Sequence, residues 1–405
     1  MGKPKIRFKG YTEDWEQRKL GDIASSFEYG LNAAAKEYDG ENKYIRITDI
    51  DDNTHEFLTD NLTSPDIDLT GADNYKLTEG DILFARTGAS VGKSYIYKNS
   101  DGLVYYAGFL IRARIKEEYD AEFVFQNTLT DRYNKYIAVT SQRSGQPGVN
   151  AQEYAEFEIK VPKKEEQTQI RTYFRNIDHL ITLHQRKCDE TKKLKKCMLQ
   201  KMFPKEGEKV PEIRFSGFTG DWKQRKFADF TWDAGKRNKE DLDLEPYAIT
   251  NEHGFIRQCD AHDDFGYMKD TDRKAYNIVQ PNSFAYNPAR INIGSIGYYK
   301  GVENVIVSSL YEVFQTDNYV SDRFLWHWFK SDDFPRWIER LQEGSVRLYF
   351  YYDKLCECQL YMPSLKEQEK IASFLDALDH LITLHKKKCD ELRNIKKFML
   401  QNMFI

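Results

Sequence analysis

The chain has 405 residues and a net charge of -4, with 40% hydrophobic, 14% aromatic and 31% charged residues. This composition supports packed cores and excludes a chain that is disordered throughout. No run of about 18 apolar residues is present, which excludes a membrane-spanning helix, and six cysteines in so long a chain are not a disulfide framework. The first residues, Met1–Lys5, lack an apolar signal core, so we expect a cytoplasmic protein.

Charge is distributed unevenly along the chain. Residues 1–160 hold 20 basic and 27 acidic side chains, and residues 204–362 hold 21 and 26. Residues 161–203 instead hold 11 basic and 5 acidic side chains, and residues 363–405 hold 8 and 6. Two acidic regions therefore alternate with two basic regions, which predicts two globules and two segments of another kind.

The first region, 1–161, begins with a segment that contains Trp15 and then alternates strand-like runs with loops. A short apolar strand is expected to end it, just before Pro162. The other predicted elements are, in chain order, a strand at 80–86, a glycine-containing loop at 88–92, a β-rich run at 103–115 and a helix near 122–136.

Residues 162–203 predict one long helix, because no Pro or Gly follows Pro162. Mostly apolar residues recur along it at alternating steps of four and three, and one position of this seam is the polar His184: the residues are Ile170, Phe174, Ile177, Ile181, His184 and Cys188. This spacing is a heptad seam, so the helix is expected to pair with another helix. At 1.5 Å per residue, about 40 residues would form a rod of about 60 Å.

The second half of the chain repeats the plan of the first. The segment Ile-Arg-Phe-x-Gly-[Tyr/Phe]-x-x-Asp-Trp ends at Trp15 and again at Trp222. Residues 363–404 match 162–203 with about half the positions identical, and both contain Asp-His-Leu-Ile-Thr-Leu-His, at 178–184 and 379–385. Internal repetition of this kind indicates a duplicated architecture.

The second region, 204–362, resembles the first in plan more than in sequence. Its predicted elements are a strand at 282–287, a glycine-containing loop at 294–297, a β-rich run at 304–315, a helix near 322–341 and a short apolar strand just before Pro363. We therefore predict an α+β protein in which two mixed α/β globules, 1–161 and 204–362, are separated by two long antiparallel helices, 162–203 and 363–405. The helices would form a coiled coil, and the whole chain a pseudo-twofold repeat.

Both globules contain windows that lack acidic residues, although each globule is acidic as a whole. These windows are residues 82–100 and 132–152 in the first globule and residues 273–302 in the second. Local charge neutralisation is what DNA binding requires. Arg can bind guanine, and Asn or Gln can bind adenine, through paired hydrogen bonds. For each residue alone, a solvated loop or a structural bond is the competing interpretation. The DNA-binding candidates are Arg86, Thr87, Lys93, Ser94, Arg143, Gln146, Asn150, Asn287, Arg290, Asn292, Ser295, Lys300, Arg347 and Tyr349.

Other motifs give weaker signals. Gly88–Ser94 is similar to a phosphate-binding loop but has three residues between its glycines instead of four, so a nucleotide-dependent enzyme is kept only as a minor alternative. Cys356 and Cys358 have no second pair at zinc-ligand spacing. Trp15 and Trp222 are interpreted as anchors that pack the first segment of each globule. We find no catalytic, cofactor or metal residues in the sequence.

Several of these features together resemble the specificity (S) subunit of type I restriction-modification enzymes. They are the repeated segment that ends in Trp15 and Trp222, the helix starts at Glu166-Gln167 and Glu367-Gln368, and the two long helices. The resemblance covers the whole chain. It implies that the globules are target recognition domains, each reading one half of a bipartite, asymmetric site in double-stranded DNA, and that the helices set the distance between them.

The resemblance also implies partners. A non-catalytic specificity subunit would dock two methyltransferase subunits, which use S-adenosylmethionine, and restriction motor-nuclease subunits, which use ATP and Mg. No cofactor would bind this chain itself. The alternative of another class is a helical scaffold that gathers partners without reading DNA. Residues expected on the helices as packing or partner-docking surface are Ile170, Ile177, Ile181, Met198, Met202, Phe203, Ile371, Leu378, Ile382, Met399, Met403 and Phe404.

Overall fold

The computed structural model describes residues 3–143, 145–251, 254–261, 273–344 and 348–405. The chain forms two compact units. Unit 1 comprises residues 1–184 and 387–405, and unit 2 comprises residues 185–386. Each unit therefore contains one globule together with one end of each long helix.

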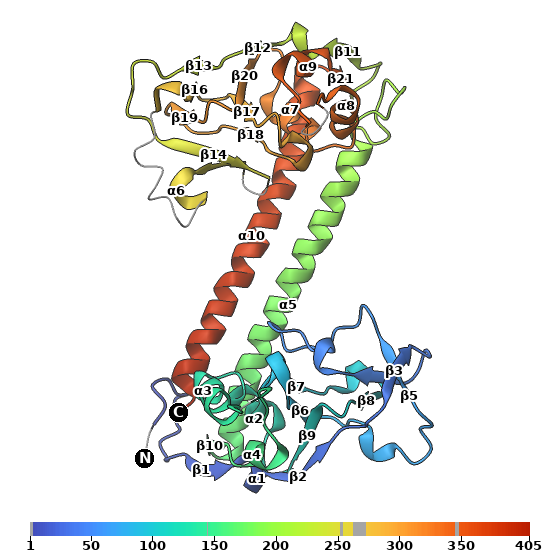
Figure 1. The fold of residues 1–405 in the computed structure, drawn as a ribbon, viewed down its shortest axis with the longest axis vertical. Coiled ribbons are helices and arrows are strands. Elements are labelled where there is room, and N and C mark those ends of the chain that lie inside the picture. Colours follow the sequence, from blue (N-terminus) through green and yellow to red (C-terminus); the bar gives the residue numbers. More distant parts are fainter. Residues whose placement is uncertain (1–2, 144, 252–253, 262–272, 345–347) are drawn as a thin grey trace. The chain divides into compact units, whose positions relative to one another are not determined.

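Unit 1 is built on a four-stranded antiparallel sheet in the order β2-β9-β6-β7, drawn in blue and cyan in Figure 1. Three strand pairs surround it: β1 with β10, β3 with β5, and β4 with β8. The elements of the first half of the chain are β1 (Glu16–Lys19), α1 (Leu20–Ile23), β2 (Ala24–Tyr29), β3 (Ala34–Glu37), β4 (Lys43–Ile45), β5 (Thr63–Asp66), β6 (Ile82–Ala85), β7 (Ser94–Ile96), β8 (Val104–Tyr106), β9 (Leu110–Ile115), α2 (Ala121–Asn127), α3 (Asp131–Thr140), α4 (Ala151–Ala155), β10 (Glu158–Val161) and α5 (Lys164–Lys201).

Unit 2 contains a matching four-stranded antiparallel sheet, β12-β20-β17-β18, and a five-stranded sheet, β13-β16-β19-β14-β15. Strands β11 and β21 pair separately, as β1 and β10 do in unit 1. The elements of the second half of the chain are β11 (Lys223–Lys226), β12 (Thr231–Asp233), β13 (Lys236–Arg237), β14 (Pro246–Thr250), β15 (Gly254–Arg257), α6 (Gln258–Ala261), β16 (Asn277–Val279), β17 (Phe284–Tyr286), β18 (Ile296–Tyr298), β19 (Val305–Val307), β20 (Glu312–Thr316), α7 (Asp322–Trp328), α8 (Asp333–Leu341), α9 (Tyr352–Glu357), β21 (Gln359–Met362) and α10 (Leu365–Met403).

The two repeated tryptophans are buried in equivalent places. Trp15 packs edge-on against Phe123 of α2 and Phe404, which follows α10. Trp222 packs in the same way against Phe324 of α7, which also contacts Phe203. The interpretation of both tryptophans as packing anchors is confirmed, and each core includes aromatic residues from the far end of the other repeat.

Each long helix begins at a duplicated set of polar contacts. In unit 1, Arg7 donates two hydrogen bonds to Glu166, at 2.7 and 2.8 Å. In unit 2, Arg214 makes the same two bonds to Glu367, at 2.7 and 2.8 Å. Both glutamates are almost fully buried, so their charges need these partners. The repeated Ile-Arg-Phe segment thus ties each globule to its helix.

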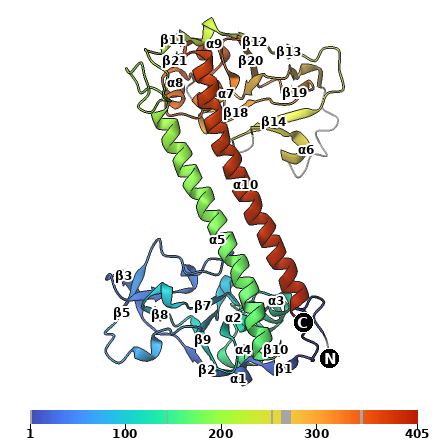
Figure 2. The ribbon, with the colours of Figure 1, turned by 180° about the vertical axis from the view of Figure 1, so that it is seen from behind.

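The two helices run antiparallel within each unit. In unit 1, Asp178 of α5 pairs with Lys396 of α10 at 2.6 Å, and the thiol of Cys389 donates to the carbonyl of Ile181. In unit 2, Lys195 of α5 pairs with Asp379 of α10 at 2.5 Å. Figures 1 and 2 show the green and red ribbons of these helices side by side in each unit. Among the described residues, no helix has the length and apolar character needed to cross a bilayer.

The predicted helix near 122–136 is two helices, α2 and α3. The hydroxyl of Thr130 accepts a hydrogen bond from the backbone of Tyr133 and so caps the start of α3. The predicted helix near 322–341 is likewise divided into α7 and α8, with the Ser331 hydroxyl bonded to the carbonyl of Trp328. In both places short hydroxyl side chains compete with the helical backbone for hydrogen bonds, a signal that apolar periodicity does not contain.

Candidate nucleic-acid interface

A loop at one end of the main sheet has the same backbone framework in both units. It follows β6 in unit 1 and β17 in unit 2, and we call residues 86–93 loop A and residues 288–295 loop B. The N–H of Val149 donates to the carbonyl of Arg86 at the start of loop A, and the N–H of Phe350 donates to that of Pro288 at the start of loop B. The strands before both loops are fully buried, so each loop is carried on a rigid support.

Arg86, the first residue of loop A, stacks on an aromatic ring. Its guanidinium lies 4.9 Å from the centre of the Tyr29 ring, and 44% of Tyr29 is exposed. Tyr29 ends β2, and its hydroxyl accepts a hydrogen bond from the backbone of Ala151. The stacking orients the Arg86 guanidinium and leaves its hydrogen-bond donors without a carboxylate partner among the described residues.

A second predicted window, within residues 132–152, lies directly beside loop A. Thr87 bridges to Gly148, and the N–H of Gly88 donates to the carbonyl of Pro147 at 3.0 Å. Gly88 has a φ of +77°, and a Cβ there would lie 3.0 Å from the side-chain nitrogen of Gln146. The fold thus places Arg86, Thr87 and the exposed Gln146 together, although 60 residues of sequence separate Arg86 from Gln146.

Lys93 and Ser94 do not fit the predicted role. Ser94 is 0% exposed, and its hydroxyl lies 2.6 Å from that of Thr128. Lys93 donates to the carbonyl of Ile50 and pairs with Asp52 at 2.5 Å. The predicted DNA-binding role is therefore wrong for both residues, because Ser94 begins the buried strand β7 and the Lys93 charge is neutralised within the unit.

Arg143 and Asn150 have structural contacts of their own. Arg143 pairs with Glu153 at 2.5 Å, and the Asn150 side chain accepts a hydrogen bond from the backbone of Glu153 as the N-cap of α4. Asn150 at such a cap stabilises the helix by about 1 kcal/mol. Both residues are exposed, but these contacts would have to be shared with any ligand.

Loop B presents different side chains on the matching framework. Asn287, just before the loop, folds back so that its side-chain oxygen accepts from the backbone of Ala289 at 3.0 Å, which makes it a turn residue. Arg290 and Asn292 are exposed. The Tyr349 and Tyr351 rings stack 5.5 Å apart with their planes within 3°, and the Phe350 bond to Pro288 brings this pair to the loop.

Two candidates of unit 2, Ser295 and Lys300, are not part of this surface. Ser295 is buried, and its hydroxyl donates to the carbonyl of Ile249 at 3.1 Å, which corrects the prediction. Lys300 is exposed, but it follows β18 at the opposite end of the sheet from loop B. Arg347 lies outside the described residues.

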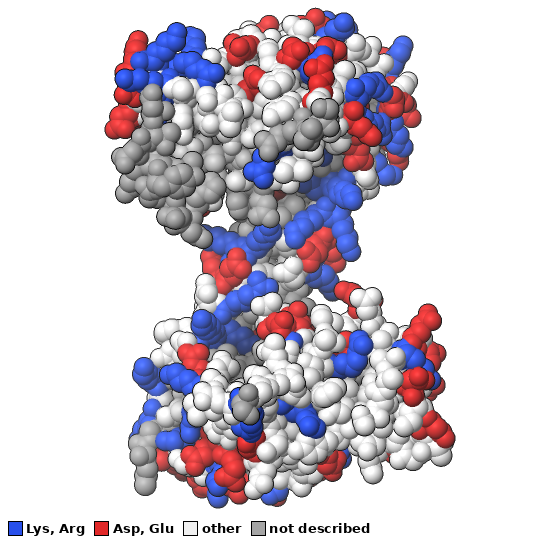
Figure 3. All heavy atoms as spheres, in the orientation of Figure 1, with Lys and Arg blue, Asp and Glu red and all other residues white. Residues whose placement is uncertain are grey.

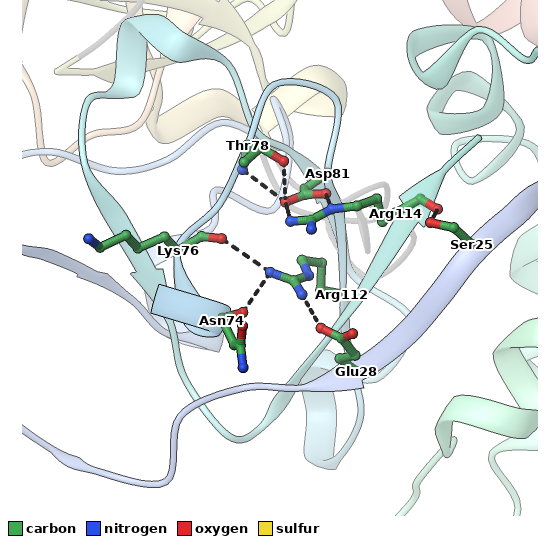
Figure 4. A network of polar contacts seen from close by, with 8 residues as sticks. All are labelled: Ser25, Glu28, Asn74, Lys76, Thr78, Asp81, Arg112 and Arg114. Carbon is green, nitrogen blue, oxygen red and sulfur yellow. Dashed lines mark hydrogen bonds and ion pairs between the residues drawn. The ribbon is translucent and has the colours of Figure 1, made fainter. Parts of the chain in front are cut away.

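A buried arginine braces the sheet that carries loop A, as Figure 4 shows. Arg112 of β9 is 2% exposed. It pairs with Glu28 of β2 and donates to the carbonyls of Asn74 and Lys76. Beside it, Arg114 makes two 2.9 Å bonds to Asp81, which precedes β6. These arginines connect three strands and are structural; sequence analysis did not single them out, because their partners are remote in sequence.

Most of the predicted docking residues on the helices are buried within their own unit. Ile181, Ile382, Met198 and Met399 are half-buried. The buried ones are Ile170, Ile177, Met202, Phe203, Ile371, Leu378, Met403 and Phe404. For these eight the expectation of a partner-docking surface is corrected, because the heptad seam and the helix ends are covered by the chain itself.

The minor alternative of a nucleotide site at Gly88–Ser94 loses its structural basis. A phosphate-binding loop leads into a helix whose amino end faces the phosphates, whereas this segment leads into strand β7. In the described part of unit 2, His327, Asp376 and Asp379 bring ligand atoms within 4.8 Å. Arg323 and Lys195 already neutralise the two carboxylates, so the cluster is an ion-pair network.

Charge on the units is mixed. Figure 3 shows acidic and basic side chains interspersed with larger uncharged areas on the visible face of unit 1, with no single basic face there. On this face, binding of a polyanion would therefore depend on local groups and not on a broad basic surface.

Comparison with known proteins gives concordant results. The type I restriction modification DNA specificity domain matches residues 12–193 and 221–394. The type I restriction enzyme MjaVIII specificity subunit of Methanocaldococcus jannaschii is 22% identical over 418 residues, which cover 95% of this chain and 91% of that protein.

Two solved structures share the fold. A type I restriction-modification S subunit from M. genitalium has a TM-score of 0.64 at 14% identity and covers 100% of this chain and 99% of its own. A chain from work on complex assembly and conformational transition of the type I R-M system has a TM-score of 0.52 at 14% identity, with 96% and 97% covered. Each of the two matched sequence regions contains one globule and most of one long helix. The chain therefore belongs to the family of type I restriction-modification specificity subunits, which are non-catalytic.

Proposed function

We propose that this chain reads double-stranded DNA at two short, different half-sites, with loop A and its neighbours on one and loop B and its neighbours on the other. One observation carries the proposal: the same backbone loop occurs in both units with different exposed side chains. Two domains that recognise different DNA sequences can share a backbone that positions them, but they need different polar side chains to contact different bases.

The chemistry at the two loops suits this task. Arg86, Thr87 and Gln146 offer a cation, a hydroxyl and an amide on one surface. Arg290 and Asn292 offer a cation and an amide beside the Tyr349 ring. Arg pairs with the acceptor edge of guanine and Gln or Asn with adenine, each good pair giving about 1–3 kcal/mol of discrimination.

The long helices would set the separation between the half-sites. Their lengths of 38 and 39 residues correspond to roughly 57–59 Å at 1.5 Å per residue. Because α5 and α10 are nearly equal in length and pair in both units, a change in one helix alone would disturb the pairing. The unspecified bases between the half-sites would then be a property of the helices, independent of either loop.

Docking of two methyltransferase subunits is part of the proposal, on residues other than those expected from the seam. Exposed apolar side chains remain on the outer faces of both helices: Leu180, Ile395 and Phe398 in unit 1, and Leu194, Leu381 and Leu384 in unit 2. Leu180 and Leu381 occupy the same position of the repeat. Two similar apolar surfaces, one per unit, suit two copies of one partner.

Methyl transfer from S-adenosylmethionine and ATP-driven cleavage would be performed by the methyltransferase and restriction motor-nuclease partners, with no cofactor in this chain. Because the target is DNA, the site of action would be the cytoplasm.

The proposal is tested by expressing the chain with its methyltransferase partner in a host without this system and mapping methylated bases across the genome. The expected pattern is one asymmetric site with two specified halves and a constant gap. Methylation without a sequence pattern would favour the scaffold alternative, and one continuous recognition sequence would contradict two separate readers.

A further inference from the structure

A tight turn beside each loop carries a large apolar side chain that points into solvent. In unit 1 the turn is Ala107–Leu110, closed by a 2.8 Å bond from the N–H of Leu110 to the carbonyl of Ala107. In unit 2 it is Ser308–Tyr311, closed by the same bond at 3.0 Å. The third residue of these turns is Phe109, which is 63% exposed, and Leu310, which is 71% exposed.

Strand register places each turn at the same end of the sheet as its loop. Ala85 pairs with Leu110, and the N–H of Arg86 donates to the carbonyl of Phe109 at 3.0 Å. In unit 2, Tyr286 pairs with Glu312, which brings Leu310 to the end where loop B begins.

In unit 2, electrostatics also links the turn that carries Leu310 to loop B. Burial raises the pKa of the Tyr311 phenol, while a hydrogen bond with the backbone of Ile249 and the positive charge of Arg290 oppose that rise. The pKa of Tyr311, the residue that follows Leu310, thus responds to the charge of Arg290 in loop B.

An isolated exposed apolar residue needs no explanation. Here an exposed apolar residue occupies the same turn position in both units, although the sequences of the units differ. Turns usually contain small and polar residues. Leaving a Phe or Leu exposed forgoes the favourable free energy of burying that side chain in the unbound chain. That energy would be recovered if a ligand covered the side chain.

We propose that Phe109 and Leu310 are specificity-determining residues that place an apolar side chain against the bases of their half-sites. The inference rests on the proposed function and adds an apolar contact to the polar ones of loops A and B. Two DNA features offer an apolar surface to such a residue: the methyl group of thymine in the major groove and an unstacked base step in the minor groove. Both are base contacts, and they respond differently to modified DNA.

The test uses the full chain assembled with its methyltransferase partner and duplexes that carry the mapped site. Phe109→Ser and Leu310→Ser are expected to weaken binding by about tenfold or more, because each side chain would be buried against DNA on binding. Melting temperatures should not change, because both side chains are exposed in the unbound chain. Phe109→Leu should restore most of the affinity. Val302→Ser is the matched control, because Val302 is exposed and apolar but follows β18 at the opposite end of the sheet from loop B; the affinity of this variant should stay within about twofold of wild type.

Modified duplexes separate the two kinds of contact. If Phe109 contacts a thymine methyl group, uracil in the first half-site weakens wild-type binding and leaves Phe109→Ser unaffected. If Phe109 enters a base step, uracil has no effect, and 2-aminopurine at that step fluoresces with the wild type but not with Phe109→Ser. Either result supports the inference.

Equal binding and equal methylation by wild type and both serine variants would overturn the inference and leave the two-reader function intact. Absence of sequence-specific methylation by the wild-type complex would instead reject the proposed function itself.

Discussion

The two units show how one framework can support different surfaces. Loops A and B follow equivalent buried strands and are held by equivalent backbone bonds. Their side chains nevertheless differ: loop A begins with Arg86 stacked on Tyr29, whereas loop B lies beside the stacked Tyr349 and Tyr351. The side chains at the two loops thus differ, while the backbone hydrogen bonds that position the loops are retained.

The support beneath the loops also differs between the units. Arg112 of β9 and Val313 of β20 occupy equivalent positions, because Leu83 pairs with Arg112 and Ala285 pairs with Val313, and both are 2% exposed. Unit 1 therefore braces its sheet with a buried cation, and unit 2 fills the same place with an apolar side chain.

The junctions between globule and helix differ in the sign of their charges. In unit 1, Glu122 of α2 lies 3.8 Å from Arg175 of α5. In unit 2 the acid is on the helix, with Arg323 of α7 paired to Asp376 of α10. Each globule is thus matched electrostatically to its own helix, and exchange of the two globules within the chain would create like-charge contacts.

The largest expected effect comes from changing the helices. Insertion of seven residues into α5 after His184 and into α10 after Lys386 adds about 10 Å to each helix, or about three base pairs of duplex at 3.4 Å each. Methylation of the original site should fall below detection, and a site with the same halves and a wider gap should replace it, as genome-wide mapping would show. An unchanged gap would refute the role of the helices in spacing.

Replacement of Arg112 tests whether the buried cation stabilises the sheet of unit 1, where unit 2 has an apolar side chain. Arg112→Val gives unit 1 the side chain that unit 2 uses at this position. It should destabilise the chain by about 2–4 kcal/mol, because the carbonyls of Asn74 and Lys76 lose their donor inside the unit. Urea unfolding measures this change, and Val313→Ala, with an expected loss of about 1–3 kcal/mol from a smaller core side chain, is the matched variant in unit 2. A loss below about 1 kcal/mol for Arg112→Val would show that the arginine network does not stabilise the sheet.

The two proposed recognition sites can be tested independently by replacing one arginine at a time. Arg86→Ala and Arg290→Ala should each weaken binding by about 1–3 kcal/mol and relax specificity in one half-site only. Both residues are partly or fully exposed, so melting temperatures should not change. Fluorescence anisotropy with duplexes altered in one half at a time provides the measurement. Relaxation of both halves by a single variant would contradict independent readers.

The smallest expected effect is on the pH dependence of stability, and it comes from His327. Gln126 occupies the equivalent position in unit 1, since each of the two residues lies six positions after the N-cap of its helix. Burial lowers the pKa of His327, although a hydrogen bond with Asp376 opposes this shift. Folding therefore favours the neutral ring, so stability is complete above about pH 6.5 and declines as the pH falls below that value. Near His327, Asp376 and Asp379 favour the charged ring and Lys195 disfavours it.

His327→Gln should consequently reduce the loss of stability between about pH 7 and 5 by up to about 1 kcal/mol. Burial tends to raise the pKa of Asp376, but hydrogen bonds from His327 and Arg323 outweigh it and lower that pKa to about 2. The stabilisation by this carboxylate is lost only as the pH falls from about 4 toward 2, which is outside the tested range. Identical slopes for wild type and variant in urea unfolding would show that His327 does not contribute.

Sequence patterns predicted the duplicated parts of the fold best. The helices expected at 162–203 and 363–405 are observed at Lys164–Lys201 and Leu365–Met403, because heptad spacing and the absence of Pro and Gly directly reflect helix geometry. The strands before Pro162 and Pro363 are also confirmed as β10 and β21. Both tryptophans were correctly interpreted as packing residues.

The candidate site was predicted less completely. Acid-free windows identified Arg86, Thr87 and Gln146 but also included the buried Ser94 and Ser295, because a window of composition does not show which side chains point inward. Tyr29 was missed, since only strand register brings β2 to loop A.

The most direct test of the central claim is a globule exchange. Residues 1–161 are replaced by the first globule of another family member, and the methylation site is mapped for the assembled complex. The two-reader account predicts that the first half-site changes completely while the second half-site and the gap stay as they were. Simultaneous change of both halves, in a complex that still methylates DNA, would contradict it.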